Sequence, residues 1–232
     1  MITSEELRVA EFDQRKEIVG VIPAPTKKKR WTQSFSGQVV TPALLRNEQV
    51  RYEDIPHTLA QKVRFNGHLQ KMGYTVGQHV CHGADMIEGP FKLAFLLHEV
   101  SEVYLPDIPA PLKPLLSVEL PDGKQIMWED LEEQHARVFF DVLGLTSLLP
   151  MIYAPEVKLM DLQMLMTEKR DMMGPEPESW EIEVSPISPS RLTIASIWTP
   201  EENRDRFNQR YGDLRSWKVS RSSCTHSAVP RS

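Results

Sequence analysis

The hydrophobic residues of this chain recur mostly three or four positions apart, which is the spacing of helices with one buried face. Polar start signals and prolines separate these segments. We predict helices over residues 3–19, 53–63, 76–88, 128–143 and 199–214, one from Leu93 to a point before Pro106, and one starting at Pro155.

Other stretches do not have this periodicity. Residues 31–51 alternate poorly and contain Ser36-Gly37 and Pro42, which predicts a small hairpin or extended flap. These patterns predict an all-α fold. Its expected parts are an N-terminal helix and flap (1–52), a helical core (53–173), a strap and helix packed on it (174–218), and a disordered tail (219–232).

The segment from Leu93 to Lys113 concentrates the chemistry. On a helix, His98 and Glu102 share a face, and Glu99 lies at its edge. Apolar neighbours leave this helix almost no solvated side, so its charged groups need ionic partners or a metal. Prolines then end the helix and hold Asp107 in a stiff loop beyond it.

Two further helices carry polar groups on apolar faces. Asp161 lies within an apolar stripe, where a carboxylate requires a metal ion or a cation; a buried salt bridge is the alternative. His79 and His82 are three positions apart, and one of them should face inward. A buried or partly exposed histidine without a ligand role is the simpler interpretation for His82, as it is for His135.

Composition narrows the choice of function. A net charge of −5 and a pI near 5.8 disfavour binding to polymeric DNA or RNA, although a local basic pocket for one nucleotide remains compatible. Cys81 and Cys224 are far apart, and no apolar run of membrane length is visible. We therefore expect reduced thiols, a packed Cys81 instead of a zinc ligand, no membrane association and a cytoplasmic location, in a host cell if the gene belongs to a phage.

The run from Lys27 to Arg30 has three possible interpretations. Four consecutive like charges could form a nuclear signal, a phosphate-binding arm or a solvated loop. The solvated loop is favoured, because such runs are common on protein surfaces.

Several motifs resemble one known family. They are the pair His98-Glu99, the stretch RFNGH (residues 64–68), YTVGQH (74–79) and VKLMDLQMLMTEKRD (157–171). The pair resembles the central motif of HD-domain phosphohydrolases. The other three stretches, in their order along the chain, resemble the phage and bacterial branch of that family, which includes 5'-deoxynucleotidases and dATP triphosphohydrolases. The family motif has Asp where this chain has Glu99.

The resemblance implies a helical bundle with one divalent metal ion. Its implied ligands are His79, His98, Glu99 and Asp161. Nitrogen and oxygen donors without thiolate suit Mn, Co, Fe, Zn or Mg. The implied catalytic acids and bases are Glu102 and Asp107, and the implied substrate-binding residues are Arg64, Phe65, His68 and Lys113.

The resemblance also implies a small-molecule substrate, a deoxynucleotide mono- or triphosphate, and a homo-oligomer. Arg64 suits this role because guanidinium presents a planar two-pronged donor to phosphate; alone, it could equally form a surface salt bridge. The alternative is a binding or regulatory protein. Glu99 reaches one methylene farther than Asp, about 1.5 Å, and could weaken or displace the metal.

Overall fold

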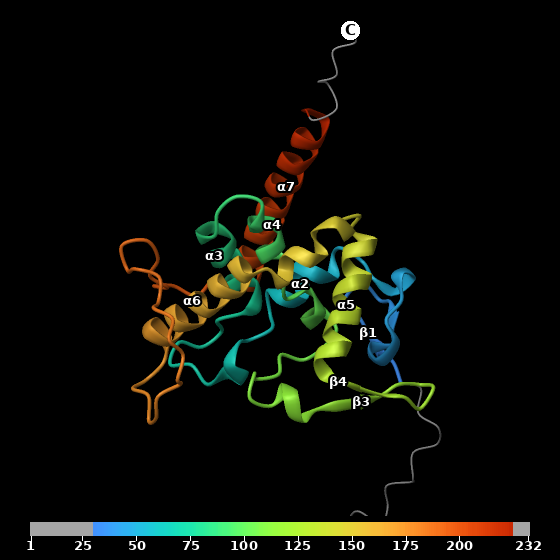
Figure 1. Cartoon of the computed structure of the whole chain (residues 1–232), viewed down its shortest axis with the longest axis horizontal. Coiled ribbons are helices and arrows are strands. Elements are labelled where there is room, and N and C mark those ends of the chain that lie inside the picture. Colours follow the sequence, from blue (N-terminus) through green and yellow to red (C-terminus); the bar gives the residue numbers. More distant parts are fainter. Residues whose placement is uncertain (1–29, 225–232) are drawn as a thin grey trace, which may run out of the picture. The chain divides into compact units, whose positions relative to one another are not determined.

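The computed structural model of the protein describes the backbone of residues 30–224 and the side chains of residues 30–216. The helix expected over residues 3–19 and the charged residues 27–29 lie outside this part. The described chain is mostly helical, in agreement with the all-α prediction (Figure 1). Among the described residues, no helix is both long and apolar enough to cross a membrane.

Six α-helices carry the described fold: α2 (Asp54–Leu59), α3 (Val76–Met86), α4 (Phe91–Leu96), α5 (Trp128–Val142), α6 (Pro155–Met172) and α7 (Pro200–Cys224). Short 3-10 helices connect them: η1 (Pro42–Leu44), η2 (Asn47–Gln49), η3 (Phe65–Gly67), η4 (Val100–Val103), η5 (Lys113–Leu115) and η6 (Thr146–Tyr153). Two small hairpins complete the fold, β1 (Thr32–Gln33) with β2 (Val39–Val40), and β3 (Ser117–Glu119) with β4 (Gln125–Met127).

Helix α3 packs against four other helices, α2, α4, α6 and α7. One continuous hydrophobic core joins these helices, and its largest fully buried side chains include Tyr74, Phe95, Phe139 and Phe207. A smaller apolar cluster, with Leu105, Ile126, Trp128 and Leu131, lies under the β3–β4 hairpin. The possible metal ligands described below come from α3, α6 and the segment that follows α4.

Local signals explain where the helices begin. The Thr75 hydroxyl accepts a hydrogen bond from the Gln78 amide at 3.3 Å and caps α3. At α7, Thr199 and Glu202 form a reciprocal capping box, with bonds of 3.2 and 2.9 Å. Pro155 occupies the first position of α6, as its fixed φ favours. All three starts agree with the sequence predictions.

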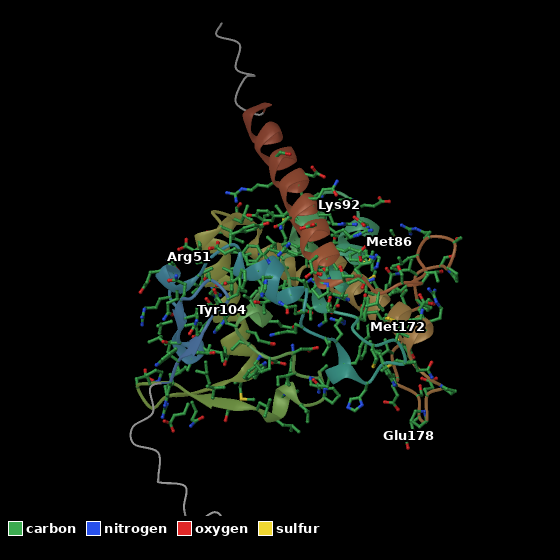
Figure 2. The ribbon with its side chains drawn as sticks, turned by 180° about the vertical axis from the view of Figure 1, so that it is seen from behind. Arg51, Met86, Lys92, Tyr104, Met172 and Glu178 are labelled. Atoms are coloured by element: carbon green, nitrogen blue, oxygen red, sulfur yellow. The ribbon has the colours of Figure 1, made fainter. Side chains whose placement is uncertain are left out.

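The predicted flap is a short antiparallel hairpin in which Thr32 pairs with Val40 and Gln33 with Val39. The second hairpin pairs Val118 with Ile126, and its turn contains Gly123 at φ 87°, a conformation that favours glycine. After α6 the chain continues as the predicted strap, residues 174–199. Figure 2 shows Met172 at the end of α6 and Glu178 farther along this strap. Within the strap, Ile187 and Ile194 are buried in the main core.

The helix predicted from Leu93 toward Pro106 is wrong in one respect, because it is interrupted after Leu96. Leu97 and Glu99 have φ/ψ values of −110°/3° and −99°/19°, and a 3-10 turn follows. The ring of His98 provides the physical reason. Its Nδ1–H donates to the Phe95 carbonyl at 2.6 Å, and this carbonyl would otherwise accept the Glu99 amide in an α-helix. His98 and Glu102 therefore do not share a helical face.

Two helix ends also differ from prediction. Helix α2 ends at Leu59 instead of residue 63, because the chain after it pairs with the segment before α3. The Arg64 amide donates to the Tyr74 carbonyl, and the Val76 amide donates to the Lys62 carbonyl. Helix α7 extends to Cys224 instead of ending near Leu214, since no proline or glycine interrupts it beyond Gly212. Residues 219–224 of the expected disordered tail are thus helical, and residues 225–232 lie outside the described part.

Close packing of α3 on α4 yields a stability prediction. A Cβ atom at Gly83 would lie 2.0 Å from Cε1 of the fully buried Phe95 ring. We expect Gly83→Ala to lower the free energy of unfolding by about 1–3 kcal/mol. The control is Gly212→Ala in α7, where a Cβ would meet nothing within 4 Å; it should be neutral or stabilising by up to about 1 kcal/mol. Urea denaturation followed by circular dichroism measures both, and equal effects would contradict the packing.

Candidate metal centre and adjoining cavity

Four side chains from separate parts of the fold converge on one point. They are His79 of α3, His98 and Glu99 between α4 and η4, and Asp161 of α6. One ligand atom from each lies within 4.8 Å of all the others. His79 is fully buried and the other three are partly buried. The group could hold one metal ion, and it contains all four residues that the sequence resemblance implied.

The two imidazoles are oriented as metal-binding histidines usually are. His98 donates its Nδ1–H to the Phe95 carbonyl, and His79 Nδ1 lies 2.6 Å from Oε1 of Glu168. Both bonds turn Nε2 toward the group, and neither Nε2 has a hydrogen-bond partner among the described residues. This arrangement leaves the lone-pair position of each ring available to an ion.

Ion-pair contacts link the four side chains to one another. His79 Nε2 lies 3.2 Å from Asp161 Oδ1, and His98 Nε2 lies 3.7 Å from the same atom. Glu99 Oε1 is 3.5 Å from His98 Nε2, so its longer side chain still reaches the group. A carboxylate oxygen therefore faces each imidazole nitrogen at a distance that an ion between them could bridge.

Glu168 is the organising residue that the sequence interpretation missed. It is fully buried on α6, and its carboxylate accepts from Tyr74 at 2.9 Å and from Arg64 Nε at 3.1 Å, in addition to His79. A signal was present, because Glu168 follows Asp161 by seven positions, which places both on one helical face. No motif assigned it a role.

Charged neighbours in this buried network oppose the effect of burial on the pKa values of His79 and Glu168. Burial and the Arg64 charge act to lower the pKa of His79, but the carboxylates of Glu168 and Asp161 outweigh them and raise it to about 9. Burial likewise acts to raise the pKa of Glu168, but Arg64 and His79 hold it below its ordinary value. Binding of a metal ion at neutral pH must therefore displace a proton from His79.

Arg64 belongs both to this buried network and to the wall of an adjoining cavity. Its side chain is only 11% exposed, with Nη1 3.8 Å from Glu99 Oε1. Burial acts to lower the pKa of its guanidinium, but Glu168, Asp161 and Glu99 raise it, so Arg64 stays charged. Arg64 is thus a fixed cation beside the metal-binding group, and not the surface salt bridge considered as its alternative.

A cavity of about 550 Å³ adjoins the group, within the size range of small-molecule sites. Glu99 and Asp161 are in its wall, together with the predicted Arg64, Phe65, Glu102, Asp107 and Lys113. The remaining lining residues are apolar: Ile108, Pro109, Ala110, Pro111, Leu165, Trp180 and Ile182. Trp180 and Ile182 belong to the strap, and nothing in the sequence pattern indicated that they face this cavity.

Two acids in the cavity wall have raised pKa values. Burial, followed by the charges of Glu99 and Asp107, raises the pKa of Glu102 well above its ordinary value. Its Oε2 is buried and has no hydrogen-bond partner among the described residues. Burial also raises the pKa of Asp107, against the opposing charge of Arg64. Raised pKa values of acids in a cavity are typical of sites that transfer protons.

Lys62 secures the segment that carries these acids, a role the sequence did not indicate. Its amine donates to the backbone carbonyls of Glu102 and Leu105. Burial lowers the pKa of Lys62, although Glu102 and Asp107 oppose the shift. The link joins the end of α2 to the start of the proline-rich loop.

The structure does not bring every expected substrate contact to the cavity. His68 is exposed at the end of η3 and is absent from the cavity lining. Lys113 lines the cavity and pairs with Glu132 at 2.9 Å. Phe65 lines it too, with its ring 5.4 Å from the Arg64 guanidinium.

The three residues for which a structural role was favoured have one. His135 is buried and donates from Nε2 to the Pro42 carbonyl at 2.7 Å. His82 packs beside Trp198, with ring centroids 4.7 Å apart, and burial lowers its pKa to about 4. Cys81 is a buried free thiol. None of them belongs to the metal-binding group.

Fold and site together define a mostly helical protein in which two histidines and two carboxylates could hold one metal ion beside a cavity. The sequence is 30% identical over 181 residues to the Escherichia coli (strain K12) protein described as "Uncharacterized protein YfdR". The aligned part covers 78% of this chain and 93% of YfdR. The chain therefore belongs to the same family as YfdR. No protein-family model matches the sequence.

The position of Glu168 predicts a selective effect on metal binding. Glu168→Gln keeps the shape but removes the charge that orients His79, so we expect metal affinity to fall about 10–100-fold. Because Arg64 then loses its buried partner, the free energy of unfolding should fall by about 3 kcal/mol. Calorimetric titration with Mn²⁺ or Co²⁺ and urea denaturation measure the two effects.

The matched control is Glu133→Gln on α5, which removes an exposed ion pair with Arg137. It should change neither metal affinity nor stability by more than about 0.5 kcal/mol. A folded Glu168→Gln protein with parental metal affinity would show that Glu168 does not support the metal-binding group.

Proposed function

We propose that the protein is a metal-dependent phosphohydrolase of the HD type that acts on deoxynucleotides. The observation that carries the proposal is the juxtaposition in one site of a possible metal-binding group, two cations and two acids with raised pKa values. Such perturbed groups in a cavity are typical of catalytic sites. The motifs that resemble HD-domain phosphohydrolases contain most of these residues.

The donor set fits a catalytic metal. His79, His98, Glu99 and Asp161 offer two nitrogens and two carboxylates without thiolate, which suits Mn, Co, Fe, Zn or Mg. A divalent ion held there supplies Lewis acidity toward a phosphoryl group. The unpartnered Nε2 atoms of both histidines support this assignment, since buried polar atoms are normally paired.

The remaining residues have separable roles in the proposed reaction. Arg64 binds phosphate oxygen with a fixed guanidinium, and Lys113 adds a second positive charge in the cavity wall. Glu102 in its protonated form donates a proton to the leaving oxygen, while Asp107 orients or deprotonates the attacking water. Lys62 holds the backbone from which both acids project.

The proposed substrate is a deoxynucleoside monophosphate, hydrolysed to deoxynucleoside and phosphate, or a deoxynucleoside triphosphate, hydrolysed to deoxynucleoside and inorganic triphosphate. The family resemblance includes both reactions, and the cation pair of Arg64 and Lys113 would bind phosphate groups in either. A homo-oligomer without affinity for polymeric nucleic acid or membranes, located in the cytoplasm, completes the proposal.

The second candidate is a nucleotide-binding or regulatory protein with weakened catalysis. Glu99 favours it, because this residue departs from the family's Asp and lies 3.8 Å from Arg64, with which it can pair instead of binding metal. Activity is better supported, since Arg64, Glu102, Asp107 and Asp161 are retained around one cavity.

Hydrolysis of a nucleotide panel tests the proposal. We expect release of phosphate or triphosphate from deoxynucleotides with at least one of Mg²⁺, Mn²⁺, Co²⁺ or Zn²⁺, loss of activity in chelator, and its recovery when the ion is restored. The product identifies the reaction. Ribonucleotides are the comparison substrates. Nucleotide binding without hydrolysis under every metal condition would favour the regulatory alternative.

The proton-transfer roles are tested separately. Glu102→Gln and Asp107→Asn should keep bound metal and near-parental substrate affinity but lower kcat at least about 100-fold, the smaller end of acid–base contributions. Arg64→Ala should weaken phosphate binding and also lower the free energy of unfolding, because it leaves the buried Glu168 carboxylate without its cation. Steady-state kinetics and metal analysis distinguish these outcomes. Parental turnover in both acid variants would show that the acids have structural roles instead.

A further inference from the structure

Two segments with an unfavourable backbone conformation border the cavity. Among the described residues, Phe65, Asn66 and Glu181 are the non-glycine residues with positive φ, at 54°, 50° and 53°. Each such residue typically costs about 1–3 kcal/mol and persists only where the surroundings enforce it. Phe65 lines the cavity, and Glu181 directly follows Trp180, which also lines it. Both segments therefore present an aromatic ring to the same space.

The two rings form an aromatic pair in the cavity wall. The ring centroids of Phe65 and Trp180 are 6.5 Å apart, with 41° between the ring planes. This is the ordinary spacing of aromatic neighbours, so the two rings together offer one aromatic surface to the cavity.

Both rings already have cationic neighbours, and neither belongs to the hydrophobic core. The Arg64 guanidinium carbon lies 5.4 Å from the Phe65 centroid, and Lys169 Nζ lies 4.6 Å from that of Trp180. Phe65 and Trp180 are partly exposed and are absent from both core clusters. Their positions are thus fixed at the cavity without core packing, which leaves ring surface available to a ligand.

The rest of the lining indicates how a ligand would be recognised. No amide or hydroxyl side chain is among the described residues that line the cavity. The charged lining residues belong to the metal-binding group, the cation pair and the proton-transferring acids. Apart from the single indole N–H of Trp180, what remains for the non-phosphate part of a ligand is apolar and aromatic surface, which holds planar rings without reading their hydrogen-bonding edges.

We propose that the part of the cavity lined by Phe65 and Trp180, the aromatic slot, binds the nucleobase of the substrate by stacking, and that side chains in this slot do not distinguish one base from another. The inference rests on the proposed function and names Trp180, on the strap, as a substrate-binding residue. A base stacked on these rings would place its attached sugar phosphate in the same cavity as Arg64 and the metal-binding group.

Binding of unphosphorylated deoxynucleosides tests the slot independently of hydrolysis. We expect calorimetric titration to detect deoxyadenosine and thymidine, but not 2-deoxyribose, because the base supplies the affinity. Trp180→Ala should weaken deoxynucleoside binding about 10-fold or more, as loss of a stacking ring does. Trp180→Phe should restore most of the affinity. Trp31→Ala is the control, since Trp31 is an exposed tryptophan outside the cavity.

Kinetics add a second readout. In Trp180→Ala, KM for deoxynucleotides should rise about 10-fold while kcat changes little, whereas inorganic phosphate should inhibit as it does the parent. The four deoxynucleotides should differ in kcat/KM by about 10-fold at most, compared with about 10⁴–10⁵ for sites that read polar groups.

The outcomes separate the two proposals. Parental deoxynucleoside affinity in folded Trp180→Ala, or equal binding of 2-deoxyribose and deoxynucleosides, would overturn the slot even if hydrolysis occurs. A 10⁴-fold preference for one base would overturn its tolerance. Deoxynucleoside binding that depends on Trp180, without hydrolysis of any nucleotide, would support the slot and contradict the proposed phosphohydrolase.

Discussion

The site depends on the contacts of one buried carboxylate, that of Glu168. A fully buried charge is tolerated only when several groups compensate it, and here Arg64, His79 and Tyr74 do so together. These partners come from the loop before α3 and from α3 itself, while Glu168 is on α6. One carboxylate therefore fixes the relative position of the Arg64 guanidinium and the His79 imidazole. The Arg64–Glu168 ion pair also compensates the charge of a polar network that lies among fully buried side chains such as Tyr74 and Phe95.

Much of the helical framework could be predicted because local signals act close to where they lie in sequence. Thr75, Pro155 and the Thr199–Glu202 box mark helix starts through contacts within one turn. Helix ends were less predictable. Helix α2 stops early because backbone pairing between Lys62 and Val76 competes with its next turn, and this pairing depends on residues beyond the helix. The break after Leu96 depends on a side-chain bond from His98, which periodicity does not report.

The candidate site could be predicted in part for a similar reason. His79, His98, Glu99 and Asp161 belong to motifs with recognisable residue types, and the structure brings them within reach of one ion. Lys62 has no such signal, and the helical position of Glu168 did not reveal its role, because the importance of both residues arises from contacts made only after distant segments pack. Trp180 is a stronger example. It is on an irregular strap in which apolar residues predict packing but not which surface they meet, and only the folded chain places it opposite Phe65.

The spacing of Asp161 and Glu168 on α6 limits how this family can vary. Seven helical residues turn the chain by about 700°, so the two carboxylates are only about 20° apart around the axis and about 10 Å apart along it. One inserted or deleted residue between them would rotate one carboxylate by about 100° relative to the other. The helix would remain stable, but it could no longer present one acid to the metal-binding group and the other to the back of His79. Relatives that keep this site should therefore differ in loop lengths and never in the length of this segment, so the uninterrupted interval is a better marker of a working site than overall sequence identity.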